Sequence, residues 1–415
     1  MPPAPEEARE KGLPVTFEDV SRAHFRIRSG IHRTPLVKSK FLSEHCGTEV
    51  YLKKDLEQET GSFKERGARN AIMLLSDAEK KHGVVAASAG NHALALAWHG
   101  RDLNVPVTVV MPTTAPMAKV QNCRNFGANV ILKGEHIQDA KDYCAEHYSD
   151  LRYINGYDDP EIVAGAGTMG IEIMEQLPDV DAVIVPIGGA GLIAGVSLAI
   201  KTLRPGVTVM GVEPANVASY AAAIKAGEPV YEFIAGTLAD GLAVPVVGPT
   251  AFKVAKHYVD DTVTVDEGLI SIAVLRCLEM EKIIVEGGGA AALAAILPGG
   301  PLYGKFRGKK VVLPLCGGNI DTTTLGRIID RGLAADKRLI RFTATVSDRP
   351  GGIANLSRAM ADVGVSIKDI YHERAWLTSR VDQVQVKCVV ETLGKEHAEE
   401  CMNVLNEQGY NVVSW

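Results

Sequence analysis

Short apolar segments alternate with longer helical patterns through most of this 415-residue chain. Residues 84–87, 107–111 and 182–186 are three such segments, and each is followed by a turn containing glycine or proline and then by a helix-like stretch. The segments are apolar at consecutive positions rather than at alternate ones, which indicates strands that are buried on both faces. Buried strands that alternate with helices predict parallel sheets with helical crossovers, so we expect an α/β fold.

The pattern changes near residue 330. A half-exposed strand is expected where apolar and polar residues alternate, and the Asp-Arg-Pro-Gly sequence at 348–351 predicts a turn after it. The elements expected here are strand, helix, strand, strand, helix and strand, at 340–346, 353–363, 365–371, 383–388, 395–408 and 410–413. This β-α-β-β-α-β order within about 75 residues is ferredoxin-like. We therefore predict a larger domain at 1–330, a linker at 331–338 and a separate small domain at 339–415.

Composition and charge argue against several classes of protein. The formal net charge of −6 is unfavourable for binding nucleic acid or an anionic membrane surface. No apolar run approaches the ~20 residues that a membrane-spanning helix requires. The seven cysteines form no CxxC pair and their number is odd, which favours free thiols in a reducing compartment. We therefore expect a cytoplasmic protein that has neither nucleic acid nor a membrane as a partner.

Lys64 lies where a glycine turn at Gly61 meets the start of an expected helix, directly after the apolar Phe63. A lysine amine can form a Schiff base with a carbonyl compound when its surroundings make the neutral amine accessible. The alternative is a lysine that packs its aliphatic stem at the start of a helix and has no chemical role. Two loops elsewhere in the chain favour the first interpretation.

Residues 188–191 (Gly-Gly-Ala-Gly) follow the expected strand at 182–186 and begin a helix. The backbone N–H groups of such a turn, together with the helix N-terminus, suit a phosphate. The sequence is not that of a dinucleotide site, because no acidic residue closes the following strand at the usual spacing. A tight turn between strand and helix without a ligand is the alternative.

Residues 88–92 (Ser-Ala-Gly-Asn-His) form a second loop between strand and helix, and Cys316 follows a strand at 311–315. Ser88 and Asn91 can bind a small carboxylate or a ring hydroxyl, or can cap the following helix. Cys316 lies at the carboxyl end of a strand, where open parallel sheets bind ligands, although a buried structural cysteine would fit equally well. One amine, one polar loop and one phosphate-type loop together indicate an enzyme that uses pyridoxal phosphate.

Four sequence segments together resemble the threonine dehydratase and serine racemase family of pyridoxal phosphate enzymes. The segments are SFKERGA, SAGNHA, GGAGLIAG and PLCGGNID, and the resemblance covers about residues 15–330. It implies fold type II, the tryptophan synthase β-like fold, with two open parallel-sheet domains and a smaller α/β subdomain at about 55–155. The part after residue 338 resembles an ACT domain, whose D-x-P-G turn corresponds to the sequence at 348–351.

The resemblance also implies roles for individual residues. Lys64 would form the Schiff base with the cofactor and move protons, Phe63 and Asn91 would flank the ring, and Cys316 would face the ring nitrogen. The residues implied to bind the phosphate through backbone N–H groups are Gly188, Gly189, Ala190, Gly191 and Leu192. Ala190 stands where many members have glycine, and we expect its φ to be negative, because only then is alanine tolerated there. The loop for the substrate carboxylate would comprise Ser88, Ala89, Gly90, Asn91 and His92.

Two of these residues favour β-elimination over racemisation. A thiol such as that of Cys316 is a weak hydrogen-bond partner, which makes the ring a weaker electron sink. Racemases of this family have a second serine where this chain has Ala89, and alanine cannot move a proton. The leading hypothesis is a threonine ammonia-lyase that also acts on serine, with its biosynthetic or catabolic role left open. The alternatives are a serine or aspartate racemase, a 3-hydroxyaspartate dehydratase, and, from another class, a non-catalytic amino-acid sensor.

Further ligands are implied at two places. Family members with a divalent-metal site have a Glu, a backbone carbonyl and an Asp, where this chain has Glu213, Val217 and Ser219, so we expect at most a monovalent or weakly bound divalent cation. The ACT resemblance suggests control by an amino acid bound at a domain interface. The residues expected to bind this effector are Asp348, Pro350, Gly351 and Asn355. An oligomerisation module without a ligand is the alternative, and a homodimer or homotetramer is expected.

Overall fold

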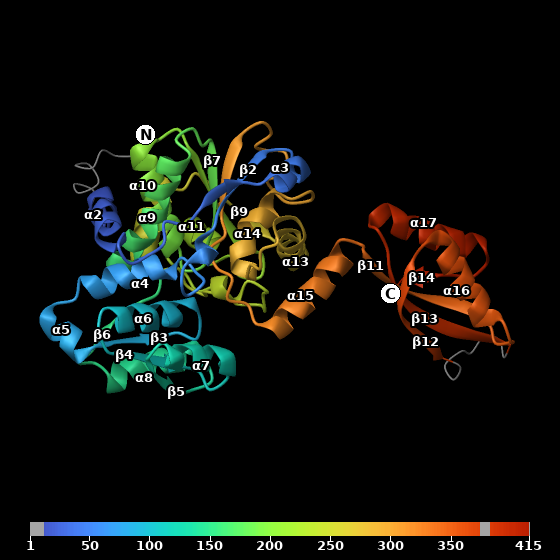
Figure 1. The fold of residues 1–415 in the computed structure, drawn as a ribbon, viewed down its shortest axis with the longest axis horizontal. Helices are drawn as coiled ribbons and strands as arrows, with labels where there is room; N and C mark the ends of the chain where they lie inside the picture. Colours follow the sequence, from blue (N-terminus) through green and yellow to red (C-terminus); the bar gives the residue numbers. More distant parts are fainter. Residues whose placement is uncertain (1–11, 374–381, 415) are drawn as a thin grey trace. The chain divides into compact units, whose positions relative to one another are not determined.

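The computed structural model describes residues 12–373 and 382–414 (Figure 1). This part of the chain forms two compact units, of which the first ends at Thr322 and the second begins at Thr323. Helix α15 (Thr322–Ala335) contains residues 331–335 of the predicted linker, so only residues 336–338 connect it to the next strand. The division between the units lies at the start of this helix, eight residues before the predicted end of the larger domain.

The first unit contains a six-stranded sheet with the order β1-β2-β10-β7-β8-β9. Its strands are β1 (Leu36–Lys38), β2 (Glu49–Lys53), β10 (Lys310–Pro314), β7 (Ala182–Pro186), β8 (Thr208–Pro214) and β9 (Asp261–Val265). All neighbouring pairs are parallel except β1 and β2. Helices α9 (Pro160–Gln176) and α10 (Gly191–Leu203) pack on one side of the sheet, and α13 (Glu267–Arg276) and α14 (Gly287–Ile296) pack on the other (Figure 1). These helices cover strands that are apolar on both faces, which is the reason for the continuous apolar runs.

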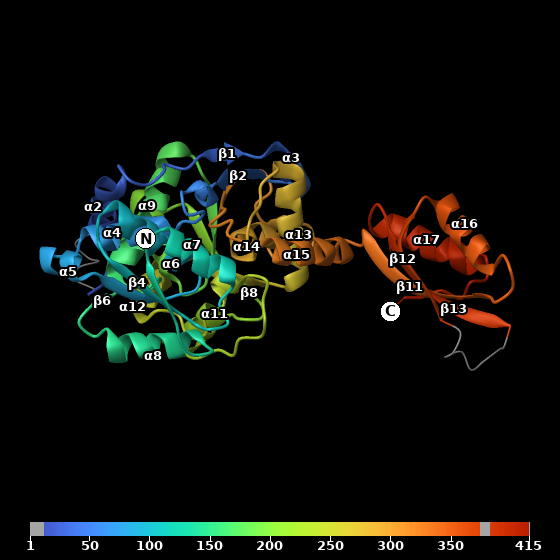
Figure 2. The same ribbon diagram turned by 60° about the horizontal axis from the view of Figure 1, so that its bottom comes forward.

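A smaller parallel sheet in the same unit has the order β5-β4-β3-β6. Its strands are β3 (Val84–Ala87), β4 (Val107–Met111), β5 (Asn129–Leu132) and β6 (Arg152–Tyr153). Helices α6 (Asn91–Asp102) and α7 (Met117–Asn125) contribute to the apolar cluster on one face, and α8 (Ile137–His147) contributes to the cluster on the other (Figure 2). The strands predicted at 84–87, 107–111 and 182–186 are confirmed, and the α/β class with two open parallel sheets is confirmed with them.

The remaining helices of the first unit connect and cover the two sheets. They are α2 (Phe17–Ile27), α3 (Lys40–Cys46), α4 (Lys64–Met73), α5 (Asp77–His82), α11 (Ser219–Ala226) and α12 (Pro249–Tyr258), with short 3-10 helices at Asp55–Glu57 and Asp240–Leu242 and a π-helix at Cys277–Glu281. Helix α4 packs against both α6 and α9. Helix α4 therefore lies between the helices of the small sheet and those of the large sheet. Its first residue is Lys64.

The second unit has an antiparallel sheet with the order β12-β13-β11-β14. Its elements are β11 (Leu339–Ser347), α16 (Gly352–Val363), β12 (Ser366–Glu373), β13 (Gln383–Glu391), α17 (Lys395–Glu407) and β14 (Val413–Ser414). The chain order is the predicted β-α-β-β-α-β. The last strand is shorter and begins later than the predicted 410–413, because Gly409 and the bonds around Tyr410 form a turn there.

Candidate active site

Backbone pairing brings Lys64 and Cys316 together. Ser62 forms a β-bridge with Gly317, and the Phe63 N–H donates to the Cys316 carbonyl at 2.9 Å. Gly61 has a φ of +76°, and a Cβ at this position would meet the Asn319 side chain, so glycine is needed at this turn. The segment before α4 is thereby fixed to the segment after β10, as expected for ligand binding at the carboxyl ends of parallel strands.

The Lys64 amine lies in a buried environment that disfavours its protonated form. Its Nζ donates to the Gly156 carbonyl at 2.5 Å and lies 5.1 Å from the centroid of the Phe63 ring. Burial lowers the pKa of Lys64 to about 8, while the nearby Glu286 carboxylate opposes this shift. A substantial fraction of the amine is therefore neutral near physiological pH, which is what Schiff-base chemistry requires.

The Asn91 side chain is held by two partners that the sequence analysis did not identify. Its Nδ2 donates to Glu286 Oε1 at 2.8 Å, and Asn319 Nδ2 donates to Asn91 Oδ1 at 2.9 Å. Burial and the charge of Asp240 raise the pKa of Glu286 to about 7, and the bond from Asn91 opposes this. Glu286 precedes three glycines at the start of α14, which is the one local signal that could have marked it.

The glycine loop at 188–191 lies between β7 and α10, with Gly189, Ala190 and Gly191 buried. Within the described part of the chain, the N–H groups of these four residues donate no hydrogen bond. Buried N–H groups without partners are rare in folded proteins, and here they lie at a helix N-terminus. This arrangement fits a phosphate group.

The expectation of a negative φ at Ala190 is wrong. Ala190 has a φ of +71° and is the left-handed residue that precedes the first turn of α10. An L-residue in this conformation costs about 1–2 kcal/mol, because Cβ approaches the following carbonyl oxygen. Such strain persists where surrounding structure fixes the backbone, and Ala190 is 2% exposed.

Cys316 and His92 are buried and uncharged. Burial raises the pKa of the Cys316 thiol well above its usual value, and Sγ lies 3.4 Å from the Pro314 carbonyl oxygen. Burial, together with the charge of Lys64, lowers the pKa of His92 to about 3, and its Nε2 lies 2.9 Å from the Ile154 carbonyl oxygen. The His92 ring therefore offers no positive charge to a carboxylate.

The loop that precedes His92 is open to solvent in part. Ser88 accepts a bond from the Gly90 N–H at 3.3 Å, and the residues from Ser88 to Asn91 are partly exposed.

Glu213 serves as a cap at the start of α11. Its Oε1 accepts from the Tyr220 N–H at 2.7 Å and its Oε2 from the Ala221 N–H at 2.9 Å. Burial raises the pKa of Glu213 to about 7. Among the described residues no group of three or more His, Cys, Asp or Glu side chains could hold a metal ion. A cation at Glu213, with Val217 and Ser219, would have to share these carboxylate oxygens.

The predicted effector residues lie at the turn between β11 and α16 in the second unit. Gly351 has a φ of +100° and precedes the helix, and the Asn355 N–H donates to its carbonyl at 2.9 Å. Pro350, Gly351 and Asn355 are exposed, and the Asp348 N–H donates to the Asp382 carbonyl at 3.0 Å. The structure thus gathers these residues at one turn.

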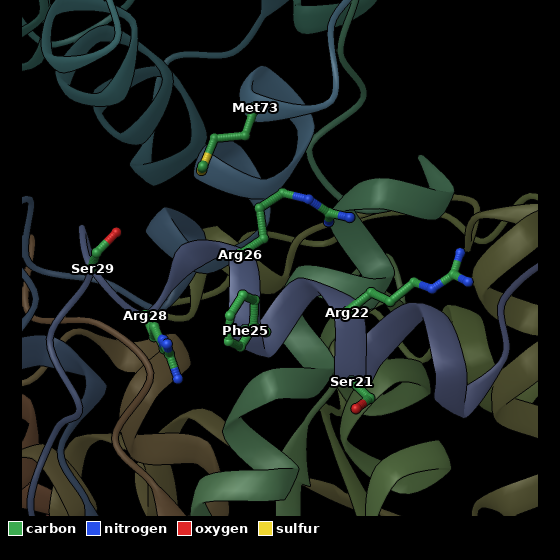
Figure 3. Close-up of a pocket in the computed structure, with 7 residues that line it drawn as sticks. All are labelled: Ser21, Arg22, Phe25, Arg26, Arg28, Ser29 and Met73. Atoms are coloured by element: carbon green, nitrogen blue, oxygen red, sulfur yellow. The ribbon is translucent and has the colours of Figure 1, made fainter.

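A separate hollow lies along α2 and contains none of the predicted site residues (Figure 3). It is lined by Ser21, Arg22, Phe25, Arg26, Arg28, Ser29 and Met73. Arg28 stacks over the exposed Phe25 ring at 4.0 Å.

In the described part of the chain, no helix is both long enough and apolar enough to cross a membrane.

The residues gathered around Lys64 fit pyridoxal phosphate. The amine with a lowered pKa suits an aldehyde, the unpartnered N–H groups at 188–191 suit a phosphate, and the neutral Cys316 thiol suits a ring nitrogen. The structure brings Phe63, Lys64, Asn91 and Cys316 together through the contacts described above.

Comparison with known proteins agrees with this fit. The sequence profile of the family described as "Pyridoxal-phosphate dependent enzyme" matches residues 27–317. The chain is 41% identical over 402 residues to the L-threonine ammonia-lyase of Thermotoga maritima, a match that covers 96% of this chain and 99% of that protein. The processed form of threonine deaminase isoform 2 from Solanum lycopersicum has a similar structure, with a TM-score of 0.71 and 34% identity over 76% of this chain and 93% of the other. Serine racemase from Dictyostelium discoideum has a TM-score of 0.70 and 35% identity over 74% of this chain and 100% of the other.

Proposed function

The chain belongs to the family of pyridoxal-phosphate dependent enzymes, and on that premise we propose that it converts L-threonine to 2-oxobutanoate and ammonia. It is a lyase that depends on pyridoxal phosphate, as its resemblance to the family indicated. The observation that carries the proposal is the position of the buried Lys64 amine, which is bonded to the Gly156 carbonyl and follows Phe63, whose N–H donates to Cys316. The match to an L-threonine ammonia-lyase along nearly the whole chain supports threonine as the substrate. L-Serine, converted to pyruvate and ammonia, would be a second substrate.

The residues of the site suit two requirements of this reaction, which are binding of the cofactor and removal of the α-proton. Bound pyridoxal phosphate would supply an aldehyde and a conjugated ring that withdraws electrons from the substrate α-carbon. The N–H groups at 188–191 would bind its phosphate, and the Cys316 thiol would face its ring nitrogen. Because a neutral thiol is a weak hydrogen-bond partner, the site favours loss of the β-hydroxyl as the α-proton leaves. Lys64 Nζ is the base that takes the α-proton.

Ala89 makes elimination more favourable than racemisation. Two-sided proton transfer needs a second acid or base opposite Lys64, and an alanine side chain can neither donate nor accept a proton. Racemisation remains the rival within the family, since a serine racemase has a similar structure. Chiral analysis of serine after incubation separates the two activities, and Ala89→Ser should raise any racemase activity. Racemisation by the unchanged chain that exceeds pyruvate formation would favour the rival.

The second unit supports a proposal of amino-acid control. Its β-α-β-β-α-β order and its turn at 348–351 are those expected of an ACT domain. We propose an amino-acid effector at Asp348, Pro350, Gly351 and Asn355, and a homodimer or homotetramer as the functional assembly. Adding single amino acids to the threonine assay tests the effector, and analytical ultracentrifugation tests the assembly. An Asn355→Ala variant that still responds like the unchanged chain would argue against this site.

Threonine turnover is the test of the proposed activity. The purified chain with bound pyridoxal phosphate is incubated with L-threonine, L-serine or 3-hydroxyaspartate, and formation of the 2-oxoacid is followed. We expect threonine to give 2-oxobutanoate and the Lys64→Ala variant to give none. A chain that binds pyridoxal phosphate and these amino acids but forms no 2-oxoacid would support a sensor instead.

A further inference from the structure

Residues 154–158, between β6 and α9, contact three separate parts of the site. The Gly156 carbonyl accepts the bond from Lys64 Nζ. The Tyr157 ring lies against Gly189 so closely that a Cβ there would clash with it, and a Cβ at Gly191 would clash with the Tyr157 carbonyl. Asp158 Oδ1 accepts from the Ala251 N–H at 3.0 Å, in the first turn of α12. We call residues 154–158 the clasp.

The shape of the clasp is set by one asparagine. Asn155 Oδ1 accepts hydrogen bonds from the N–H groups of Tyr157 at 3.0 Å and Asp158 at 3.1 Å. This side chain-to-backbone turn holds Tyr157 against the glycine loop and Asp158 against the start of α12. A small displacement of the clasp would therefore move the acceptor of the Lys64 amine and the support of the glycine loop together.

His92 is the residue of α6 that holds the clasp. It is 6% exposed, and its Nε2 lies 2.9 Å from the Ile154 carbonyl oxygen. Because a carbonyl oxygen only accepts hydrogen bonds, Nε2 must carry the proton and donate it. The ring also packs on Gly156, where a Cβ would lie 2.8 Å from His92 Cγ. His92 Nδ1 is buried and has no partner among the described residues, so the bond to Ile154 is the one that the ring makes.

An apolar side chain at position 92 would avoid the cost of the unpartnered Nδ1, which is about 1–3 kcal/mol for a buried polar atom. The His92 ring instead donates from Nε2 to the clasp, at Ile154. The clasp also contains Gly156, whose carbonyl accepts the bond from Lys64 Nζ. A solely space-filling role does not account for that bond.

We propose that His92 is a positioning residue of the active site, which fixes the clasp and through it sets the Lys64 amine relative to the phosphate-binding glycine loop. The proposal rests on the proposed function for the reaction, but it concerns cofactor retention and is testable without turnover. The sequence predicts that His92 belongs to the loop that binds the substrate carboxylate. The proposal gives its side chain a different role, which is to hold the clasp.

The test compares two substitutions at position 92 in the full-length chain with bound pyridoxal phosphate. His92→Leu removes the donor and keeps a similar volume, whereas His92→Gln keeps an N–H donor. The rate of cofactor release into a trap is measured, together with the pH midpoint of the cofactor absorbance. We expect roughly five- to tenfold faster release and a shifted midpoint in His92→Leu, as for the loss of one hydrogen bond, and values within about threefold of the original in His92→Gln.

Leu96→Ala is the matched control, because Leu96 is a fully buried residue of the same helix that packs in the cluster of the small sheet. It should lower the melting temperature without changing cofactor release. Unchanged release in His92→Leu, or equally fast release in Leu96→Ala, would overturn the proposal. So would a rise in KM for threonine with unchanged release, since that result assigns the ring to the substrate carboxylate. Threonine turnover by the unchanged chain tests the proposed function separately.

Discussion

Replacing Arg66 with methionine should lower the free energy of unfolding of the first unit by roughly 3–5 kcal/mol. Arg66 is fully buried, and its guanidinium binds two carboxylates in bidentate fashion, those of Asp55 at 2.6 and 2.9 Å and of Glu172 at 2.7 and 2.9 Å. Lys53 Nζ binds Glu172 at 2.5 Å and is, among the residues that the structure describes, the one other cation paired with these carboxylates. Removing Arg66 leaves two buried carboxylates opposite one lysine, which is the reason for the large magnitude.

Differential scanning calorimetry of the full-length chain measures this effect. The transition of the first unit should fall by roughly 5–8 °C, from about 1.5 °C per kcal/mol in a unit of this size, and the transition of the second unit should not move. Arg33→Met is the control, because the Arg33–Glu175 pair is 59% and 46% exposed and should contribute less than about 1 kcal/mol. A loss below about 1 kcal/mol in Arg66→Met would show that Asp55 and Glu172 do not depend on this guanidinium for their burial.

The same substitution should change acid stability in a defined direction. Burial opposes ionisation of Asp55, but the Arg66 guanidinium outweighs this and holds its pKa below the usual value. A lowered pKa in the folded state gives stability that is fully present above the unfolded pKa and is lost as the pH falls through the folded one. Without Arg66 the pKa of Asp55 rises, so the midpoint of acid unfolding should move to higher pH.

Three further predictions follow from the site. Because burial lowers the pKa of Lys64 to about 8, uptake of pyridoxal phosphate by the cofactor-free chain should speed up with rising pH and level off above about 8, since the neutral amine is the nucleophile; a rate that is flat across this range would contradict the assignment. Ala190→Val places a β-branched residue at a φ of +71° and should weaken pyridoxal phosphate binding at least about tenfold by fluorescence titration, whereas Ala190→Gly should retain it. Dialysis against a chelator should leave kcat for threonine unchanged, because both oxygens of Glu213, the one carboxylate of the expected cation site, already accept backbone N–H bonds.

The strands at 84–87, 107–111 and 182–186 could be predicted because their apolar runs are short and continuous. Such a run between turn signals is typical of a strand that is buried on both faces. The extent of α15 could not be predicted, because only Ile328 and Gly332 in it are buried and its end at 331–335 lies within the predicted linker. The φ of Ala190 was predicted with the wrong sign, since nothing local identifies a left-handed alanine. Its conformation is set by the buried surroundings of the loop.

That Lys64, Asn91 and Cys316 lie in one region could be predicted, because each lies in a recognisable segment at a helix start or a strand end, and their chemical roles stay proposals. Glu286 and the clasp could not, because their roles depend on contacts between distant parts of the chain. Asn91 and Glu286 are 195 positions apart, and Lys64 and Gly156 are 92 apart. Residues 155–158 have an ordinary turn composition, and their importance follows from what they touch. The effector site and any cation site stay predictions.

Reduction of the cofactor-bound chain with borohydride, followed by peptide mass spectrometry, tests the central claim most directly. Reduction converts a Schiff base between a lysine and pyridoxal phosphate into a stable bond, so the labelled lysine identifies the amine. We expect a single labelled peptide that contains Lys64, and loss of the label in Lys64→Ala. A label on another lysine, or an unlabelled chain that still forms 2-oxobutanoate from threonine, would contradict it.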